Sequence, residues 1–579
     1  QFKYHNQRAV AKEYAKVLVE QFEKEIRRWN PDVLIPVTLH KKRTYDIQGK
    51  DLLGFYDDDV AANDDLLVKY LSQNKEAVLG DIIATIQKEQ NEIIRATPYK
   101  NMIVQGVAGS GKTTVALHRI SYILYNYEEV YKPSEFCIVG SSDMLLNYIS
   151  SGLPELDVNH VRQMRMDVFL PYLMEKSWKK KFSIIEEDSK ACKKSRLDFV
   201  YALECFLKKW IEKHLNLQDI RDRELGVILS QENMQDTRSR NPELSLFQLE
   251  KLLNQRIRQR IQFLCTEKEE GFRKEKQKAY RNYFCSSKNK WTEIQIYRTF
   301  LEELEQAGDE THKFEGGYKE TIAHVEKGQM DLYDTAALCL IRKRIFLKKE
   351  TDEFSQIILD KAQDFGETIY YVLRQVLPRC YFTIMGDVSQ NIRYETGLND
   401  WEDLKKILLR DDRDSFYLLA KSYRNTIEIS QYAGRVLEKA SLGNYKIQPV
   451  IRRHGNPVCV QMQQRKDIGK QLKALLENIQ QKGFETIAVI CRDEKDTETV
   501  RKVLQTEQEE GFHNGIMVLP VTLTKGLEFD AVVLWQPDTL RYGMNVKEAK
   551  LLYVAITRAL HELYLLGENE QTELLKSRS

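Results

Sequence analysis

The sequence predicts an α/β fold in which two domains with parallel sheets follow one another and a large helical segment interrupts the first. Short apolar runs alternate with amphipathic helical patterns over 81–156 and again from 326 onward, and this alternation is typical of parallel sheets. The stretch between them, 157–325, is helical by pattern and rich in Lys and Glu. A parallel sheet that resumes after a long insertion is the simplest interpretation.

Length and composition restrict the class of protein. At 579 residues the chain is too long for one core and predicts about three or four domains of roughly 150 residues each. No apolar run approaches the roughly 18–20 residues that a membrane span requires, and the first residues carry charge rather than an apolar signal core. The net charge of +2 argues against a surface that is basic throughout.

The nine cysteines show no spacing that suggests chemistry. They contain no C-x-x-C pair, which argues against a zinc or redox site and favours the reduced thiols of a cytoplasmic protein. The chain starts with Gln rather than Met, so we expect that the native chain can be longer. We also expect a monomer without membrane contact.

Residues 1–80 are expected to be a helical or irregular N-terminal segment. Apolar side chains recur at three- and four-residue spacings over 9–28, which predicts an amphipathic helix or one arm of a helical hairpin. The following residues are less regular, apart from a strand-like run at 33–39. The pattern over 81–96 has an apolar face and predicts a further helix, which ends just before Pro98.

Short apolar runs predict the strands of two sheets. We assign 81–156 and 326–410 to a first α/β domain, 157–325 to a helical insertion domain and 411–579 to a second α/β domain. The strands expected in the first domain are 102–104, 136–139, 356–360 and 381–387. Those expected in the second are 415–419, 458–462, 487–491, 516–520, 531–535 and 562–566.

The stretch 106–114, GVAGSGKTT, is a predicted phosphate-binding loop. It follows an apolar strand and leads into a helical pattern, which is the context that a Gly-x4-Gly-Lys-Thr loop requires. Small residues let backbone N–H groups surround a polyphosphate, while Lys112 reaches the β/γ-phosphates and the Thr113 hydroxyl binds Mg²⁺. The residues expected to bind ATP here are Gly106, Gly109, Ser110, Gly111, Lys112, Thr113 and Thr114.

A second strand supplies the carboxylate that such a site needs. The run QIILD at 356–360 ends in Asp360, which is expected to hold Mg²⁺ together with Thr113. With both motifs present, the chain resembles superfamily 1 helicases of the UvrD/Rep type. Within them it is most similar to the HelD-like branch, which includes RNA polymerase recycling ATPases and DNA helicase IV-like proteins. The resemblance implies two tandem RecA-like P-loop domains and an ATP hydrolase that uses ATP and Mg²⁺.

Two further motifs of the first domain carry this resemblance. TIQKEQ at 85–90 resembles the Q motif, which implies that Gln90 reads the adenine edge. GDVSQNI at 386–392 resembles motif III. That resemblance implies that Gln390 contacts the γ-phosphate and couples the site to the neighbouring domain.

The second domain contributes a motif that is expected to face both ends of the nucleotide. KSYRN at 421–425 resembles motif IV. The resemblance implies that Tyr423 stacks on the adenine and that Arg424 acts as an arginine finger.

Two more motifs complete the series. KGLEFD at 525–530 resembles motif V, so Glu528 is expected to contribute to nucleotide binding. YVAITRA at 553–559 resembles motif VI, which implies that Arg558 is a second finger. Cations delivered from the second domain to a γ-phosphate held by the first make closure of the cleft depend on ATP, which is the logic of a motor.

Two lengths favour the HelD-like branch. UvrD-like DNA helicases carry a large subdomain between motifs IV and V, whereas only about 100 residues separate Arg424 from Lys525. The long gap before Asp360 fits a helical domain that, in the HelD-like family, enters the main channel of RNA polymerase. That family also has a long N-terminal coiled coil and a small β-rich part, for which 1–80 is too short, so the helix at 9–28 is interpreted as what remains of the coiled coil.

One position departs from the family pattern. The family has Glu directly after the motif II Asp, where it orients the attacking water, and here that residue is Lys361. A cation cannot act as that base, so we expect Mg·ATP to bind and turnover to be slow or absent, at a loss of about 10²–10⁴-fold. A sequence variant, an engineered block and a transfer of the role to Asp364 remain alternatives.

Three clusters of basic and aromatic residues are candidates for contact with single-stranded nucleic acid. Aromatic stacking together with phosphate pairing holds single strands without sequence readout. The same runs also suit solvated helix faces. They lie at 178–182, 256–260 and 288–291.

Three functions are compatible with these features. The first is a HelD-like motor that binds RNA polymerase and remodels or recycles transcription complexes. The second is a single-stranded-DNA translocase or helicase of the UvrD type. The third is an ATP-binding clamp with impaired hydrolysis, because of Lys361.

Overall fold

The computed structural model describes two compact units, 1–87 and 88–579. The described residues are 43–48, 51–57, 88–140, 161–285, 291–311, 317–348, 353–422, 425–440, 448–449, 458–462, 468–504, 515–524 and 527–576. In the first unit, strands β1 (Arg43–Gln48) and β2 (Asp51–Asp57) pair antiparallel. The expectation of a helical or irregular 1–80 missed this hairpin, because two short strands with mixed polar and aromatic residues give only a weak alternation. The predicted helix at 9–28 and the strand-like run at 33–39 lie outside the described residues.

A six-stranded parallel sheet forms the centre of the first α/β domain in the second unit. Its strand order is β12-β3-β11-β10-β4-β5. The strands are β3 (Met102–Gly106), β4 (Phe136–Gly140), β5 (Arg162–Arg165), β10 (Gln356–Leu359), β11 (Tyr381–Gly386) and β12 (Ser415–Leu419). The four strands predicted for this domain are therefore confirmed.

Two predictions about the limits of this sheet were wrong. Strand β12 was expected in the second domain, but its residues pair with β3. Strand β5 lies in the stretch expected to be inserted from 157 onward, but it pairs with β4. An apolar run predicts a strand without saying which sheet accepts its hydrogen bonds, and only the register resolves this.

Helices cover both faces of the sheet. Successive side chains of a strand point to opposite faces, and the central strands are mainly apolar, so both faces must be covered. Helix α4 (Lys112–Asn126) packs on the face that carries Met102, Val104 and Ile358. The other face, with Ile103, Ile357 and Leu359, packs against a different set of helices. These are α6 (Met166–Met174), α14 (Leu332–Ile341), α15 (Glu367–Val376) and α16 (Glu402–Leu408).

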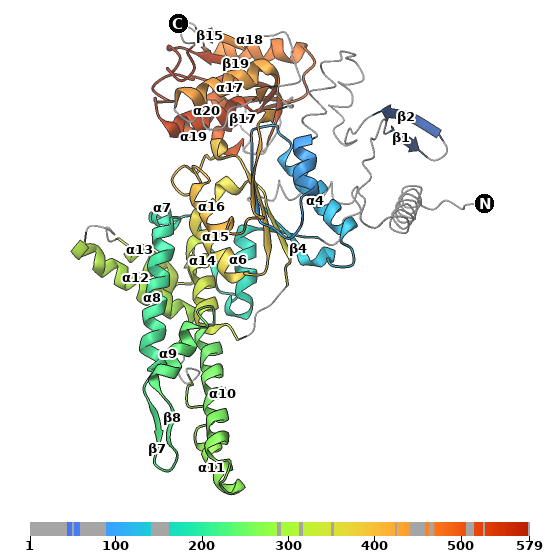
Figure 1. Cartoon of the computed structure of the whole chain (residues 1–579). Coiled ribbons are helices and arrows are strands. Elements are labelled where there is room, and N and C mark those ends of the chain that lie inside the picture. Colours follow the sequence, from blue (N-terminus) through green and yellow to red (C-terminus); the bar gives the residue numbers. More distant parts are fainter. Residues whose placement is uncertain are drawn as a thin grey trace. The chain divides into compact units, whose positions relative to one another are not determined.

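The insertion is largely helical and continues the core of the first sheet. One apolar cluster runs from strand residues such as Ile357 to α10 residues such as Ile257, so the insertion shares this core. Figure 1 shows α10 extending beyond the end of α8, with the β7–β8 hairpin beside α10 and α11 at the tip of the insertion. The helices are α7 (Ala191–Lys194), α8 (Leu197–Leu215), α9 (Gln231–Ser239), α10 (Leu246–Leu264), α11 (Glu270–Ala279), α12 (Glu293–Thr311) and α13 (Lys319–Glu326). The short strands are β6 (Ser183–Ile184), β7 (Ile220–Asp222), β8 (Gly226–Leu229) and β9 (Gln329–Met330).

A second parallel sheet follows, in the order β15-β19-β18-β16-β17. Helices α17 and α20 pack on one face and α18 and α19 on the other. The strands are β15 (Cys459–Met462), β16 (Ile487–Cys491), β17 (Ile516–Pro520), β18 (Phe529–Trp535) and β19 (Ala559–Gly567). The helices are α17 (Ile427–Lys439), α18 (Ile468–Gln481), α19 (Glu494–Leu504) and α20 (Val546–Ile556). The predicted α/β fold with two parallel sheets is confirmed, and none of the described helices is long and apolar enough to cross a membrane.

Candidate nucleotide-binding site

The loop between β3 and α4 has the backbone of a phosphate cradle. Gly109 and Gly111 have φ angles of 72° and 77°, a left-handed conformation that glycine adopts without strain. A Cβ atom at Gly106 would lie 2.5 Å from Ser110 Oγ, so the loop also needs a residue without a side chain there. Helix α4 begins without a side-chain cap, which leaves its first N–H groups and the positive end of its dipole for an anion.

Lys112 and Gln90 both bond to carbonyl groups of this loop. The Lys112 ammonium donates to the carbonyl oxygens of Gly106 at 2.7 Å and Val107 at 3.0 Å. Gln90 Nε2 donates to the Ser110 carbonyl at 3.1 Å. The structure therefore places Gln90 beside the loop.

Thr113 and Asp360 form the candidate magnesium site. They are 247 residues apart, yet Thr113 Oγ1 donates to Asp360 Oδ2 at 2.6 Å. The carboxylate is 1% exposed, and its other oxygen accepts the Lys361 N–H at 2.7 Å. A hydroxyl and a carboxylate are hard oxygen ligands of the kind that Mg²⁺ prefers, so these residues fit the ion that the sequence predicts.

Lys361 occupies an unusual backbone conformation directly after Asp360. Its φ and ψ angles are 56° and 43°, a region that residues other than glycine rarely adopt. The chain then enters a buried 3₁₀ turn, Ala362–Asp364. In this turn Gln363 accepts the Asp387 N–H at 3.0 Å through Oε1. The turn after β10 is thus attached to the end of β11. Asp364 is 2% exposed, and its use as a base remains a prediction.

The end of β11 carries a buried polar network centred on Asp387. Its Oδ1 accepts from Gln105 Nε2 at 2.9 Å, and its Oδ2 accepts from Gln390 Nε2 at 2.8 Å. Gln105 is 0% exposed within β3, and its Oε1 accepts from Trp401 Nε1 at 2.7 Å. Sequence reasoning did not select Gln105, although a Gln within a buried apolar strand was a usable signal.

Two residues of the second domain reach this network. Arg558 Nη2 donates to Gln390 Oε1 at 3.2 Å. Tyr553 Oη accepts the Ala108 N–H of the phosphate loop at 3.3 Å and donates to Asp387 Oδ2 at 3.4 Å. Burial raises the pKa of Tyr553 well above its ordinary value, and Asp387 raises it further, so the hydroxyl keeps its proton. The second domain is thereby bonded to both the phosphate loop and Gln390.

The remaining predicted nucleotide ligands are Tyr423, Arg424 and Glu528. Tyr423 and Arg424 lie outside the described residues. Glu528 is half-buried directly before β18, next to Leu527, whose carbonyl accepts from Arg558 Nη1 at 3.1 Å.

The candidate nucleic-acid clusters differ in how far their aromatic rings are available. Trp178 packs edge-on against Phe182, with ring centroids 5.5 Å apart. Trp291 packs against His214 at 4.3 Å. In the cluster at 256–260, the Arg260 guanidinium lies 5.1 Å from the ring centroid of Phe263, which follows the cluster.

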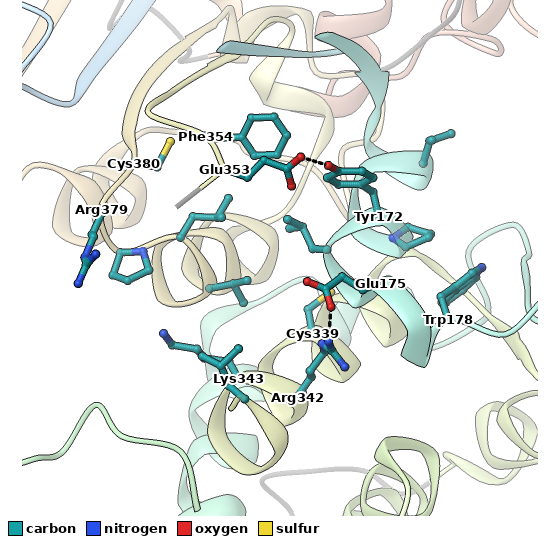
Figure 2. A pocket seen from close by; sticks show the side chains of 17 residues that line it. Tyr172, Glu175, Trp178, Cys339, Arg342, Lys343, Glu353, Phe354, Arg379 and Cys380 are labelled. Carbon is teal, nitrogen blue, oxygen red and sulfur yellow. Dashed lines mark hydrogen bonds and ion pairs between the residues drawn. The ribbon is translucent and has the colours of Figure 1, made fainter. Parts of the chain in front are cut away.

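A cavity of about 490 Å³ lies near the N-terminal ends of strands β10 and β11 of the first sheet. Its lining includes Phe354 and Cys380, which precede β10 and β11, whereas Asp360 and Asp387 follow these strands. Figure 2 shows Tyr172 and Trp178 on one wall and the Arg342–Glu175 ion pair below Tyr172; this pair is 2.8 Å long. The volume is within the range of ligand pockets, but the candidate nucleotide site is elsewhere.

Comparison with known proteins places these motifs in a family context. The family described as UvrD/REP helicase N-terminal domain matches residues 86–395, and the UvrD-like helicase C-terminal domain matches 515–566. Among solved structures, the C-terminal domain of a possible DNA helicase from Lactobacillus plantarum WCFS1 is 27% identical over 27% of this chain and 92% of its own, with a TM-score of 0.22. No curated protein matches the chain.

Proposed function

The chain belongs to the UvrD/REP helicase family, and from this premise we propose that it is an ATP-driven motor with a cleft between two RecA-like domains. The observation that carries the proposal is the bond between Arg558 of the second domain and Gln390 of the first, at 3.2 Å. A cation that reaches the γ-phosphate side of the site from the other domain makes the domain contact depend on the nucleotide.

The residues around the loop have distinct roles in this proposal. Thr113 and Asp360 would hold Mg²⁺, which would neutralise negative charge on the phosphates. Lys112 would leave the Gly106 and Val107 carbonyls for the β/γ-phosphates. Arg558 would stabilise charge on the γ-phosphate, with Gln390 beside it.

Four further ligands complete the proposed site. Gln90 would turn from the Ser110 carbonyl to the adenine edge. Tyr423 would stack on the adenine, Arg424 would act as an arginine finger and Glu528 would assist nucleotide binding.

We further propose that the motor is HelD-like and acts on RNA polymerase in the cytoplasm, as a monomer. Two features support this finer assignment. Between β13 (Lys421–Ser422) and β18, the described residues form the helices and strands of the second domain and no additional subdomain. The first domain, in contrast, carries an insertion with long helices, among them α8 and α10 of 19 residues each. Free single-stranded DNA remains the alternative substrate.

A second candidate function is a nucleotide-gated clamp that binds ATP and hydrolyses it slowly. Lys361 is the specific observation in its favour, because an ammonium cannot accept a proton from water. Such a protein would use ATP binding, rather than turnover, to hold its partner.

The deciding experiment compares ATP hydrolysis by the natural chain and by Lys361→Glu. If the lysine replaces the base, Lys361→Glu should raise kcat by about 10²-fold or more, while Lys361→Gln, which removes the charge without supplying a base, should not. Equal rates in all three proteins would refute the idea that this position limits turnover.

The same proteins identify the partner. Retention of core RNA polymerase on the tagged chain at moderate salt is expected for the HelD-like assignment. Failure to retain polymerase, together with stimulation of ATP hydrolysis by single-stranded DNA, would favour a UvrD-type translocase instead.

A further inference from the structure

Lys550 is a buried lysine of helix α20 whose partner lies on the first domain. It is 1% exposed, and its ammonium donates to Asn399 Oδ1 at 2.8 Å. The ammonium also lies 5.5 Å from the ring centroid of Tyr394. Within the described part of the chain Lys550 forms no ion pair. A buried cation that bonds only to neutral groups is costly, which makes this position unusual for a purely structural residue.

The oxygen that Lys550 contacts belongs to the loop that follows Gln390. Asn399 Oδ1 also accepts from Asn391 Nδ2 at 3.1 Å, and Asn391 is the residue directly after Gln390. The same Asn391 amide donates to the Leu398 carbonyl at 2.9 Å. The Lys550 ammonium and the Asn391 amide therefore converge on one atom and close the loop 391–399 at its two ends.

Helix α20 places Lys550 on the same face as Tyr553, three residues further on. Tyr553 donates to Asp387 Oδ2, the oxygen that also accepts from Gln390. Helix α20 thus contacts the chain on both sides of Gln390. Tyr553 bonds to Asp387, which precedes Gln390, and Lys550 bonds to Asn399, which follows it. Displacement of either point changes where the Gln390 amide lies.

We propose that Lys550 is a positioning residue for recognition of the γ-phosphate: by holding Asn399 it keeps Gln390 and the first-domain loop where they distinguish ATP from ADP. The inference rests on the proposed nucleotide site and deepens it.

The charges around Lys550 explain why an anion should favour this arrangement. Burial lowers the pKa of Lys550 to about 8, although Asp387 and Asp400 act in the opposite direction. The two carboxylates therefore compensate the ammonium only in part. The other ionisable groups near this contact are Tyr553 on α20, the Lys547–Glu395 pair at 3.2 Å and Tyr394 on the loop. A further negative charge in the cleft would stabilise the protonated lysine.

The test measures the ratio of the Kd values for Mg·ADP and for a non-hydrolysable Mg·ATP analogue. Lys550→Met, which keeps the length of the side chain, should lower this ratio about ten-fold, the effect of losing one contact of about 1.4 kcal/mol, and leave ADP binding unchanged. Lys550→Arg, which keeps the charge, should retain most of the ratio. Lys495→Met, which removes an exposed lysine of the same domain, is the matched control.

A pH series gives a readout that a merely structural lysine would not move. From pH 7.5 to 9.5 the ammonium loses its proton, so the ratio in the natural chain should fall, whereas Lys550→Arg should stay level. This arm needs no neutral variant, so the proposal remains testable if Lys550→Met does not fold. An unchanged ratio in Lys550→Met, or equal pH profiles of the natural chain and Lys550→Arg, would overturn the inference alone. Failure of the natural chain to bind either nucleotide would overturn the proposed function and this inference with it.

Discussion

Replacement of Lys194 by Met is expected to destabilise the junction between the insertion and the first sheet. The Lys194 side chain is 0% exposed, and its ammonium lies 3.0 Å from Asp188 Oδ2, 2.6 Å from Asp331 Oδ2 and 2.8 Å from Asp334 Oδ1. The three carboxylates could hold a metal ion by their spacing, but the ammonium lies among them. Methionine keeps the apolar stem and leaves three buried carboxylates without their cation.

The structure places the cost near the lower end of the range for broken buried ion pairs, at about 3 kcal/mol. Other donors remain on the carboxylates, because Thr321 Oγ1 and Tyr297 Oη donate to Asp188 and Asp334, each at 2.6 Å. Burial and the neighbouring Asp334 also raise the pKa of Asp331 to about 7, so one carboxylate can take up a proton near neutral pH.

The measurement is amide hydrogen exchange of α7 and α14, because a chain of several domains does not unfold in a single two-state step. A loss of about 3 kcal/mol corresponds to a decrease in protection of about a hundred-fold. Lys274→Met, which removes an exposed pair with Glu270, should change protection by less than about three-fold. If Lys194→Met changes protection in α7 and α14 as little as this control does, the cluster does not stabilise the junction. Addition of Asp334→Asn to Lys194→Met should restore part of the protection, since it removes one of the uncompensated charges.

Three further predictions concern single groups. Because the pKa of Asp331 is raised to about 7, its contribution to stability is present at low pH and is lost as pH rises from about 4 through 7. Protection of α14 should therefore fall between about pH 4 and 7, by at most about 1.4 kcal/mol per pH unit, and Asp331→Asn should remove this dependence. Asp360→Asn should weaken binding of the Mg·ATP analogue by at least about ten-fold and leave metal-free nucleotide binding nearly unchanged, because it removes the charge that would pair with the ion beside Thr113; equal loss in both titrations would contradict a metal role. Gly397→Ala should lower the thermal midpoint of the first domain, because the added Cβ would lie 2.3 Å from the Gln363 carbonyl oxygen, and a typical cost of overpacking is about 1–3 kcal/mol; an unchanged midpoint would show that the loop moves freely.

The strands of both sheets could be predicted because their apolar runs are short, continuous and bounded by turns. Their assignment to sheets was less secure, as β12 shows. Its sequence, SFYLL, suits either domain, and only hydrogen bonding to Met102–Gly106 places it in the first sheet. The insertion limit at 157 failed for the same reason, since β5 is a short, partly polar strand, RQMR.

The candidate site was predictable where a local motif fixes the chemistry. The spacing of the phosphate loop requires glycine at 106 and 111; a Cβ atom at Gly106 would lie 2.5 Å from Ser110 Oγ, and Gly111 adopts a positive φ. Prediction of the contact between Thr113 and Asp360 required the order of the strands in the sheet. The resemblance of the ordered motifs to a known family implied that order. Lys550 was not predictable, because its importance comes from burial against Asn399, 151 residues away, and an isolated lysine on a helix normally indicates a solvated face.

The backbone conformation at Lys361 does not depend on the chemistry of its side chain. The left-handed conformation at this residue follows from the turn that takes the chain from Asp360 into Ala362–Asp364, and Gln363 fixes that turn by its bond to Asp387. The Cα–Cβ bond of a glutamate at this position would point in the same direction. The left-handed conformation would cost it a similar free energy, about 1–2 kcal/mol for any residue with a side chain. The turn therefore fixes the backbone at residue 361 independently of which side chain is present there. For this reason Lys361→Glu should alter the rate of hydrolysis without altering the fold, and ATP binding should depend far less on this position than turnover does.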